Sequence, residues 1–372
     1  MKARWPYAAV IAVFLALVAA RWDARTGFTS LLHFSEGYAA RRIAPLRDLP
    51  LATMPAGNGY DGQFYAQLAV APGLRDPGLA TALDAPAYRA RRILPAWTAW
   101  LLGLGRPWLV VNVFALLNVG CWLALAWLLP RWLPGKDLRS FAAWACCLLG
   151  LGCLDSVRLS LTDLPASLLL AVGICAIETG RRRSAVLAFA GAALTKETSL
   201  LACGVFGDST ARPSPWRNAL VCTATAAVPL VLWSFYVGSV FGFSTGLGEG
   251  NFDWPGLAWT RHLRECGRSL LAGDFDGRYS FGLLAALSLA WQAVWIWRHP
   301  EPRNPWWRIG AVYALLLPLL GDGVWHGYWA ALRAMLPLTL AYTLLIRNER
   351  RFWLLLLPGH ATLPHALWRF LP

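Results

Sequence analysis

Residues 108–129 read WLVVNVFALLNVGCWLALAWLL, an apolar run without a single charged side chain. A helix needs roughly 20 mostly apolar residues to cross a bilayer, so this run is long enough to span one. Other apolar runs, some of them short, recur along the chain, and 57% of its 372 residues are hydrophobic while only 15% are charged. This composition is too apolar for a soluble domain. We therefore expect an all-α polytopic transmembrane protein with about 9–11 membrane segments.

Basic residues indicate the orientation of the chain. Lys2 and Arg4 precede the first apolar stretch, residues 8–20, and basic flanks stay on the cytoplasmic side. The stretch ends in small residues, as a cleavable signal peptide does, but the many apolar runs that follow favour an uncleaved first helix. With a cytoplasmic N-terminus, short arginine clusters such as residues 181–183 are cytoplasmic, and nearly all acidic residues are external.

We expect one membrane domain over residues 1–372. Residues 1–22 form its first transmembrane helix, and residues 23–106 form a large external loop with interfacial helices. Residues 107–372 contain the remaining transmembrane helices and a second external loop, residues 241–279. The first loop is rich in arginine, but long loops are translocated largely regardless of charge.

The formal charge of +14 does not indicate a nucleic-acid partner, because the arginines lie between apolar runs, where they anchor the chain to the membrane surface. Many of the 22 tryptophans lie at the ends of these runs, which suits contact with membrane lipids at the interface. The eight cysteines form no Cys-x-x-Cys motif, and no two histidines have the spacing of metal ligands. We expect no cofactor and no resident metal, although a divalent ion held by carboxylates stays open.

The most distinctive segment is GNGYDGQFY, residues 57–65, in which glycines flank a single acid among aromatic residues. Glycine permits turns that other residues resist, so Asp61 can be presented at the tip of a turn, with Tyr60 and Tyr65 available to pack on a ligand. An ordinary Asp-Gly turn is the alternative.

A second segment, LDAPAYRARRILP at residues 83–95, places Arg89, Arg91 and Arg92 just before a short apolar run that we expect to lie in the membrane interface. The planar guanidinium donates paired hydrogen bonds to phosphate. These arginines could therefore bind a phospholipid or a lipid-linked phosphate. Simple extension of the side chains towards the interface is the alternative.

Further charges interrupt or border apolar runs at Asp163, at Lys196 and Glu197, and at Arg333. A charge at the bilayer centre costs about 2.5–3.5 kcal/mol on insertion scales, so these side chains need water or partners. Charges in such positions are candidates for function. A structural salt bridge between Asp163 and Lys196 is the alternative.

Together these segments resemble the C superfamily of membrane-embedded glycosyltransferases (GT-C), which use polyprenyl-phosphate sugars and carry a catalytic acid in the first external loop. The resemblance rests on YDGQFY at residues 60–65, TDLP at residues 162–165, LTKET at residues 194–198 and LRAMLP at residues 332–337. Bacterial members associated with cell-surface glycopolymer formation follow YDGQFY with Asp-x-Pro-x-Tyr-Arg, here residues 84–89. Many members carry paired acids in the first loop, whereas Asp61 stands alone.

The resemblance implies a bacterial inner (plasma) membrane protein that transfers a sugar from a polyprenyl-phosphate donor to a cell-envelope glycan or lipid acceptor, with inversion at the anomeric carbon. Asp61 is the expected general base. The donor phosphate is expected at Arg89, Arg91, Arg92 and Arg333. The expected substrate contacts are Tyr60, Gln63, Tyr65, Asp84, Tyr88, Asp163, Lys196 and Glu197.

Two other functions use similar residues. A transporter or flippase for a lipid-linked glycan would bind the same phosphate and need no base. A polymerase or ligase of surface polysaccharide would share the lipid-linked substrates and the large external loops.

Overall fold

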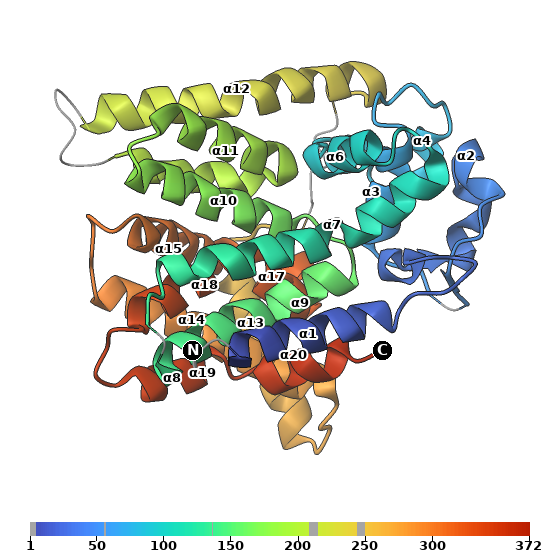
Figure 1. Cartoon of the computed structure of the whole chain (residues 1–372). Helices are drawn as coiled ribbons and strands as arrows, with labels where there is room; N and C mark the ends of the chain where they lie inside the picture. The colour runs from blue at the N-terminus through green and yellow to red at the C-terminus, as the bar shows by residue number, and fades with distance from the viewer. Residues whose placement is uncertain (1–4, 56, 136, 208–214, 244–249) are drawn as a thin grey trace.

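A computed structural model describes residues 5–55, 57–135, 137–207, 215–243 and 250–372, and this part of the chain is mostly helical with very little strand. Figure 1 shows the helices side by side in one body, with α12 along one edge and the first loop at one end. Lys2 and Arg4, on which the predicted orientation depends, lie outside the described residues.

Three described helices are long and apolar enough to cross a membrane: α7 (Pro107–Leu128), α12 (Pro215–Phe241) and α14 (Gly277–Arg298). Two bent pairs raise the number to five if each pair is one span. The chain thus has the helices of an all-α membrane protein. The expectation of 9–11 segments is too high for the described residues, because the other apolar runs form helices that are too short.

The first bent pair is α8 (Leu138–Leu149) and α9 (Leu151–Arg158), which meet at 42° around Gly150. Asp155 and Arg158 are part of α9. The carboxylate of Asp155 is buried, and both Arg158 and Arg369 pair with it.

The second bent pair is α17 (Tyr328–Ala334) and α18 (Leu336–Ile346). The two helices meet at 62°. Pro337 lies in the first turn of α18, where a proline is tolerated, but its ring and missing N–H prevent the preceding helix from continuing unbroken. The bend ends α17 just after Arg333.

The predicted first loop folds as a packed unit with its own apolar core, which includes Phe34, Phe64 and Tyr65. Its only described strands, β1 (Phe34–Ser35) and β2 (Thr53–Met54), are parallel and pair Phe34 with Thr53. The unit also contains α3 (Asp61–Val70) and α6 (Leu94–Leu102), which pack together and against α7. The short α6 agrees with the prediction of a helix that does not span.

The remaining elements complete the path of the chain. The predicted second loop contains an amphipathic helix, α13 (Leu257–Leu271). Residues 352–371 form two short helices, of which α20 (Leu363–Phe370) packs along α9. The other described elements are α1 (Trp5–Ala19), η1 (Thr29–Leu32), η2 (Glu36–Arg41), α2 (Ala44–Arg47), α4 (Leu79–Ala82), α5 (Pro86–Ala90), η3 (Leu129–Arg131), α10 (Asp163–Glu178), α11 (Arg182–Thr195), η4 (Glu197–Phe206), α15 (Pro305–Leu316), η5 (Leu317–Leu319), α16 (Asp322–Trp325) and α19 (Phe352–Gly359).

Candidate functional site

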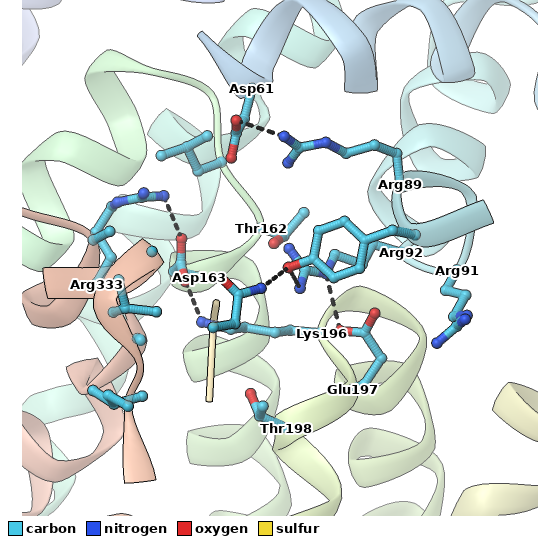
Figure 2. A pocket seen from close by; sticks show the side chains of 18 of the residues that line it. Asp61, Arg89, Arg91, Arg92, Thr162, Asp163, Lys196, Glu197, Thr198 and Arg333 are labelled. Atoms are coloured by element: carbon cyan, nitrogen blue, oxygen red, sulfur yellow. Dashed lines mark hydrogen bonds and ion pairs between the residues drawn. The ribbon is translucent and has the colours of Figure 1, made fainter. Parts of the chain in front are cut away.

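The ends of several helices border one cavity of about 460 Å³ (Figure 2). α3 and α10 begin at it with Asp61 and Asp163, α11 ends at it, and α17 contributes Arg333. Five cationic side chains and three carboxylates are among its described lining residues, a formal excess of two positive charges. Such a cavity favours an anionic ligand.

Asp61 is the first residue of α3, and the turn before it depends on Gly59. The φ of Gly59 is +67°, and a Cβ there would lie 2.4 Å from the carbonyl oxygen of His33. Only glycine fits such a turn comfortably. As predicted, the glycines of this segment allow the chain to turn sharply and present Asp61 to the cavity.

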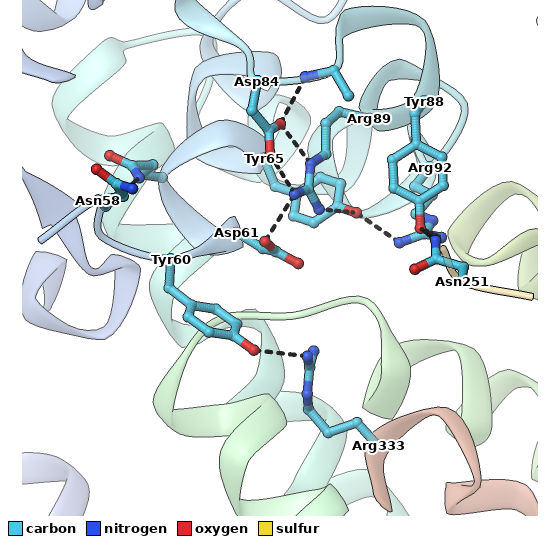
Figure 3. A network of polar contacts seen from close by, with 12 residues as sticks. Asn58, Tyr60, Asp61, Tyr65, Asp84, Tyr88, Arg89, Arg92, Asn251 and Arg333 are labelled. Carbon is cyan, nitrogen blue, oxygen red and sulfur yellow. Dashed lines mark hydrogen bonds and ion pairs between the residues drawn. The ribbon is translucent and has the colours of Figure 1, made fainter. Parts of the chain in front are cut away.

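Arg89 binds two carboxylates at once (Figure 3). Its Nη2 atom lies 2.8 Å from Oδ1 of Asp61 and 2.7 Å from Oδ2 of Asp84, and its Nε atom lies 2.9 Å from Oδ1 of Asp84. Among the described residues, the second oxygen of Asp61 has no hydrogen-bond partner, and 31% of this side chain is exposed. One carboxyl oxygen is therefore held while the other is free to meet a ligand.

The charge state of Asp61 follows from these neighbours. Burial raises the pKa of the Asp61 carboxyl, but the positive charge and hydrogen bond of Arg89 lower it. Together with smaller contributions from Arg333 and Arg92, Arg89 holds this pKa below its usual value. Burial likewise lowers the pKa of Arg89, but Asp61, Tyr65 and Asp84 together outweigh burial and hold that pKa well above the ordinary value. Asp61 is thus an ionised carboxylate at neutral pH.

Arg92 connects the first-loop unit to the break after α11. Its Nε atom lies 2.9 Å from Oε2 of Glu197, and its two terminal nitrogens donate to the hydroxyls of Tyr65 at 3.0 Å and Tyr88 at 2.5 Å. Among the described residues, the buried Oε1 atom of Glu197 accepts no hydrogen bond. The guanidinium is therefore fixed, and one carboxylate oxygen lacks a partner.

Each carboxylate oxygen of Asp163 accepts a hydrogen bond from a cationic side chain. Lys196 donates to Oδ1, and Nη1 of Arg333 donates to Oδ2 at 3.1 Å. The salt bridge between Asp163 and Lys196, one of the two alternatives from the sequence, is therefore present. Arg333 also donates from Nη2 to the hydroxyl of Tyr60 at 2.9 Å, which connects this group to the residue before Asp61.

Arg91 differs from the other cationic side chains of the cavity. Within the described part of the chain it has no hydrogen bond, ion pair or aromatic partner, and in Figure 2 its side chain lies apart from the network. It also lines a second, apolar hollow of about 420 Å³ along α12, whose wall includes the exposed side chains of Phe235 and Val231. Arg91 thus lies where the charged cavity meets an apolar surface.

The structure brings most of the predicted site residues to this cavity, with two exceptions. Gln63 is fully buried away from it: Oε1 accepts from the N–H of Ser35 at 3.2 Å, and Nε2 donates to the carbonyl of Asn58 at 2.7 Å. The amide of Gln63 thus stabilises the loop, and the expectation that Gln63 contacts the substrate stays a prediction. Asp84 contacts Arg89 but is not among the lining residues. The lining residues that were predicted are Tyr60, Asp61, Tyr65, Tyr88, Arg89, Arg91, Arg92, Asp163, Lys196, Glu197 and Arg333.

Three polar lining residues were not predicted: Thr162, Thr198 and Asn251. The two threonines belong to the quoted TDLP and LTKET segments, so the sequence carried a signal for them. Asn251, whose Nδ2 donates to the hydroxyl of Tyr88 at 3.4 Å, comes from the second loop, where no motif marks it.

The acids of the cavity are all engaged by cations. Among the described residues, no group of three or more histidine, cysteine, aspartate or glutamate side chains could hold a metal ion. The carboxylates of Asp61, Asp163 and Glu197 are paired with Arg89, Lys196 and Arg92, respectively.

Comparison with known proteins adds nothing to this description. No protein-family model, curated protein or solved structure matches the chain. The chemistry of the cavity is therefore the basis for assigning a function.

Proposed function

We propose that this protein is a membrane glycosyltransferase of the GT-C type, which transfers a sugar from a polyprenyl-phosphate donor to a cell-envelope glycan or lipid. One observation carries the proposal: an ionised carboxylate with a free oxygen, Asp61, lies in a cavity with excess positive charge that meets an apolar hollow at Arg91. The cavity would lie at the external face of a bacterial plasma membrane.

The chemistry needs a base and a stabilised leaving group. The acceptor hydroxyl attacks the anomeric carbon and gives its proton to Asp61, for which a carboxylate within hydrogen-bond reach is required. The bond between that carbon and the phosphate oxygen breaks, and its electron pair stays on the phosphate. Fixed cations stabilise this developing charge, and Arg89, Arg91, Arg92 and Arg333 are available for it. A single displacement inverts the anomeric configuration.

The lipid part of the donor accounts for the position of Arg91. A phosphate on a polyprenyl chain needs a cation at the border of an apolar surface, and Arg91 lies at such a border. α12, which forms the apolar side, exposes Val231, Phe235 and other large apolar side chains. A water-soluble sugar nucleotide has no apolar chain that could bind to this surface.

Sugar transfer by the purified protein tests the proposal. We would place the protein in nanodiscs and measure transfer from a panel of polyprenyl-phosphate sugars, comparing the wild type with Asp61→Asn, which keeps the shape and removes the base. Asp48→Asn, at an exposed position outside the cavity, is the matched control. Loss of turnover with donor binding retained, in Asp61→Asn alone, is the expected result. Equal turnover in all three proteins would rule out Asp61 as the base.

A transporter for a lipid-linked glycan is the second candidate, because a further cationic cavity of about 640 Å³ lies at the C-terminal end of α14. Arg298, Arg350 and Arg351 line it, so an anionic headgroup could be bound there as well. At the other end of α14, Arg278 contacts His326 at 2.9 Å, two residues after Val324, which lines the first cavity. Movement of a labelled lipid-linked glycan across a liposome membrane, without sugar transfer, would favour the transporter.

A further inference from the structure

The hydroxyl of Tyr60 receives two hydrogen bonds from groups that can only donate. Nε1 of Trp329 lies 2.8 Å from the hydroxyl oxygen, and Nη2 of Arg333 lies 2.9 Å from it. An indole N–H and a guanidinium have no acceptor atom. Both contacts therefore use the lone pairs of the phenol oxygen, and the proton of Tyr60 must point elsewhere.

Tyr65, on the first turns of α3, repeats this arrangement. Its hydroxyl oxygen accepts from Nη1 of Arg92 at 3.0 Å and, more weakly, from Nη1 of Arg89 at 3.5 Å. Figure 3 shows the hydroxyl between the two arginines. Here too the oxygen accepts only, and the proton is left without a partner.

Within the described part of the chain, neither hydroxyl donates a hydrogen bond to a protein acceptor, yet both residues line the cavity. Burial raises the pKa of the Tyr60 hydroxyl, so its proton stays in place at neutral pH. A hydroxyl that accepts from a cation is polarised and donates more strongly, because hydrogen bonds in a chain reinforce one another. The cavity thus offers strengthened O–H donors beside its cations at Tyr60 and Tyr65. A third is Tyr88, whose hydroxyl accepts from Arg92 and Asn251.

We infer that the Tyr60 and Tyr65 hydroxyls form a subsite that donates hydrogen bonds to ionised phosphoryl oxygens of the substrate, an inference that rests on the proposed use of a polyprenyl-phosphate donor. Phosphoryl oxygens carry negative charge and only accept, so they complete the hydrogen bonding of both tyrosines and lie among the cations that polarise them. The two tyrosines flank Asp61 in the sequence, so the same short segment supplies the base and two donors to the leaving group. The proton of each hydroxyl stays on its oxygen throughout.

Binding of two matched lipids tests this subsite without requiring turnover. The probes are a polyprenyl phosphate and the polyprenol of the same chain length, titrated into the full-length protein in nanodiscs. Tyr60→Phe and Tyr65→Phe keep the rings and remove the hydroxyls. Because a hydrogen bond to a charged group is lost, each should weaken binding of the phosphate about ten- to a hundredfold, with binding of the polyprenol unchanged. Tyr38→Phe, outside the cavity, is the control and should match the wild type.

The outcomes separate this inference from the proposed function. If both phenylalanine variants bind the phosphate as tightly as the wild type while Asp61→Asn abolishes sugar transfer, the subsite is overturned and the glycosyltransferase stands. If the wild type transfers no sugar but the variants lose phosphate affinity selectively, the subsite stands and the proposed reaction fails. Thermal unfolding identifies a variant that has merely lost its fold. A folded variant that loses affinity for the polyprenyl phosphate and for the polyprenol equally would also overturn the subsite.

Discussion

Lys196 donates a hydrogen bond to Asp163 across a separation of 33 residues. The contact connects the break between α11 and η4 to the first residue of α10, so the charged interruption of an apolar run is paired and not exposed to lipid. Within a membrane, irregular backbone is tolerated only where it is buried in protein or faces water. Arg333 binds the other oxygen of the same carboxylate at 3.1 Å and brings α17 to this point.

Asp163→Asn should destabilise the protein strongly. The change keeps the shape of the side chain but leaves Lys196 and Arg333 without their buried counter-charge, a loss that costs about 3–5 kcal/mol. The midpoint of thermal unfolding in detergent should fall accordingly. Adding Lys196→Met to Asp163→Asn should recover part of the loss, because one unpaired cation is removed. A wild-type midpoint in the single variant would contradict a structural role for this pair.

Arg91→Gln should weaken donor binding without affecting stability. Within the described residues Arg91 has no protein partner, so its removal leaves no charge unpaired, while a phosphate at the entrance loses a charge-assisted contact. We expect the KM for the lipid-linked donor to rise about tenfold at an unchanged unfolding midpoint. Steady-state kinetics and thermal unfolding measure the two effects. Arg75→Gln, also without a described partner and outside the cavity, is the control, and a KM change there of equal size would assign the effect to surface charge.

Hydropathy predicts the helical class and the long helices α7, α12 and α14, because a run of about 20 apolar residues reads directly as a span. It does not predict where an apolar run bends. The segments on either side of Gly150 and of Met335 are together long and apolar enough for one span, so each pair reads as a single crossing. The glycine and Pro337 were visible in the sequence, but whether such a residue bends a helix is decided by the packing around it.

The site was predictable where the chemistry is local. Asp61 and the arginines of residues 89–92 belong to short segments whose composition marks them. Pairings between distant segments were mostly hidden: nothing in the sequence indicates that Arg333 contacts Tyr60, 273 residues away. The contact of Gln63 with Ser35 was hidden for the same reason, since Ser35 comes from a different part of the first loop.

Replacing Arg89 should change the pH dependence of sugar transfer. The Arg89 guanidinium holds the pKa of Asp61 below its usual value, so the base form persists at low pH and is lost only as the pH falls through that lowered pKa. Arg89→Gln removes the charge, and the acidic limb of the kcat/KM profile should move to higher pH by about one unit or more. Arg89→Lys keeps a charge without the planar fork and should give an intermediate limb. Identical limbs in all three proteins would mean that Asp61 does not titrate in the rate-determining step.

Gly62→Ala should damage both stability and transfer, because α3 begins in direct contact with the backbone before α10. A Cβ at Gly62 would lie 2.4 Å from the carbonyl oxygen of Leu159 and 3.0 Å from that of Leu32, and neither backbone atom can move aside easily. Overpacking of this kind costs about 1–3 kcal/mol, and relief by moving α3 would displace Asp61 from the cavity. Gly73→Ala is the matched control, since a Cβ there meets no described atom within 4 Å. The midpoint of thermal unfolding and the rate of sugar transfer should both fall in Gly62→Ala and stay at wild-type values in Gly73→Ala. Wild-type behaviour of Gly62→Ala would show that the start of α3 is not held against Leu159 as closely as the structure has it.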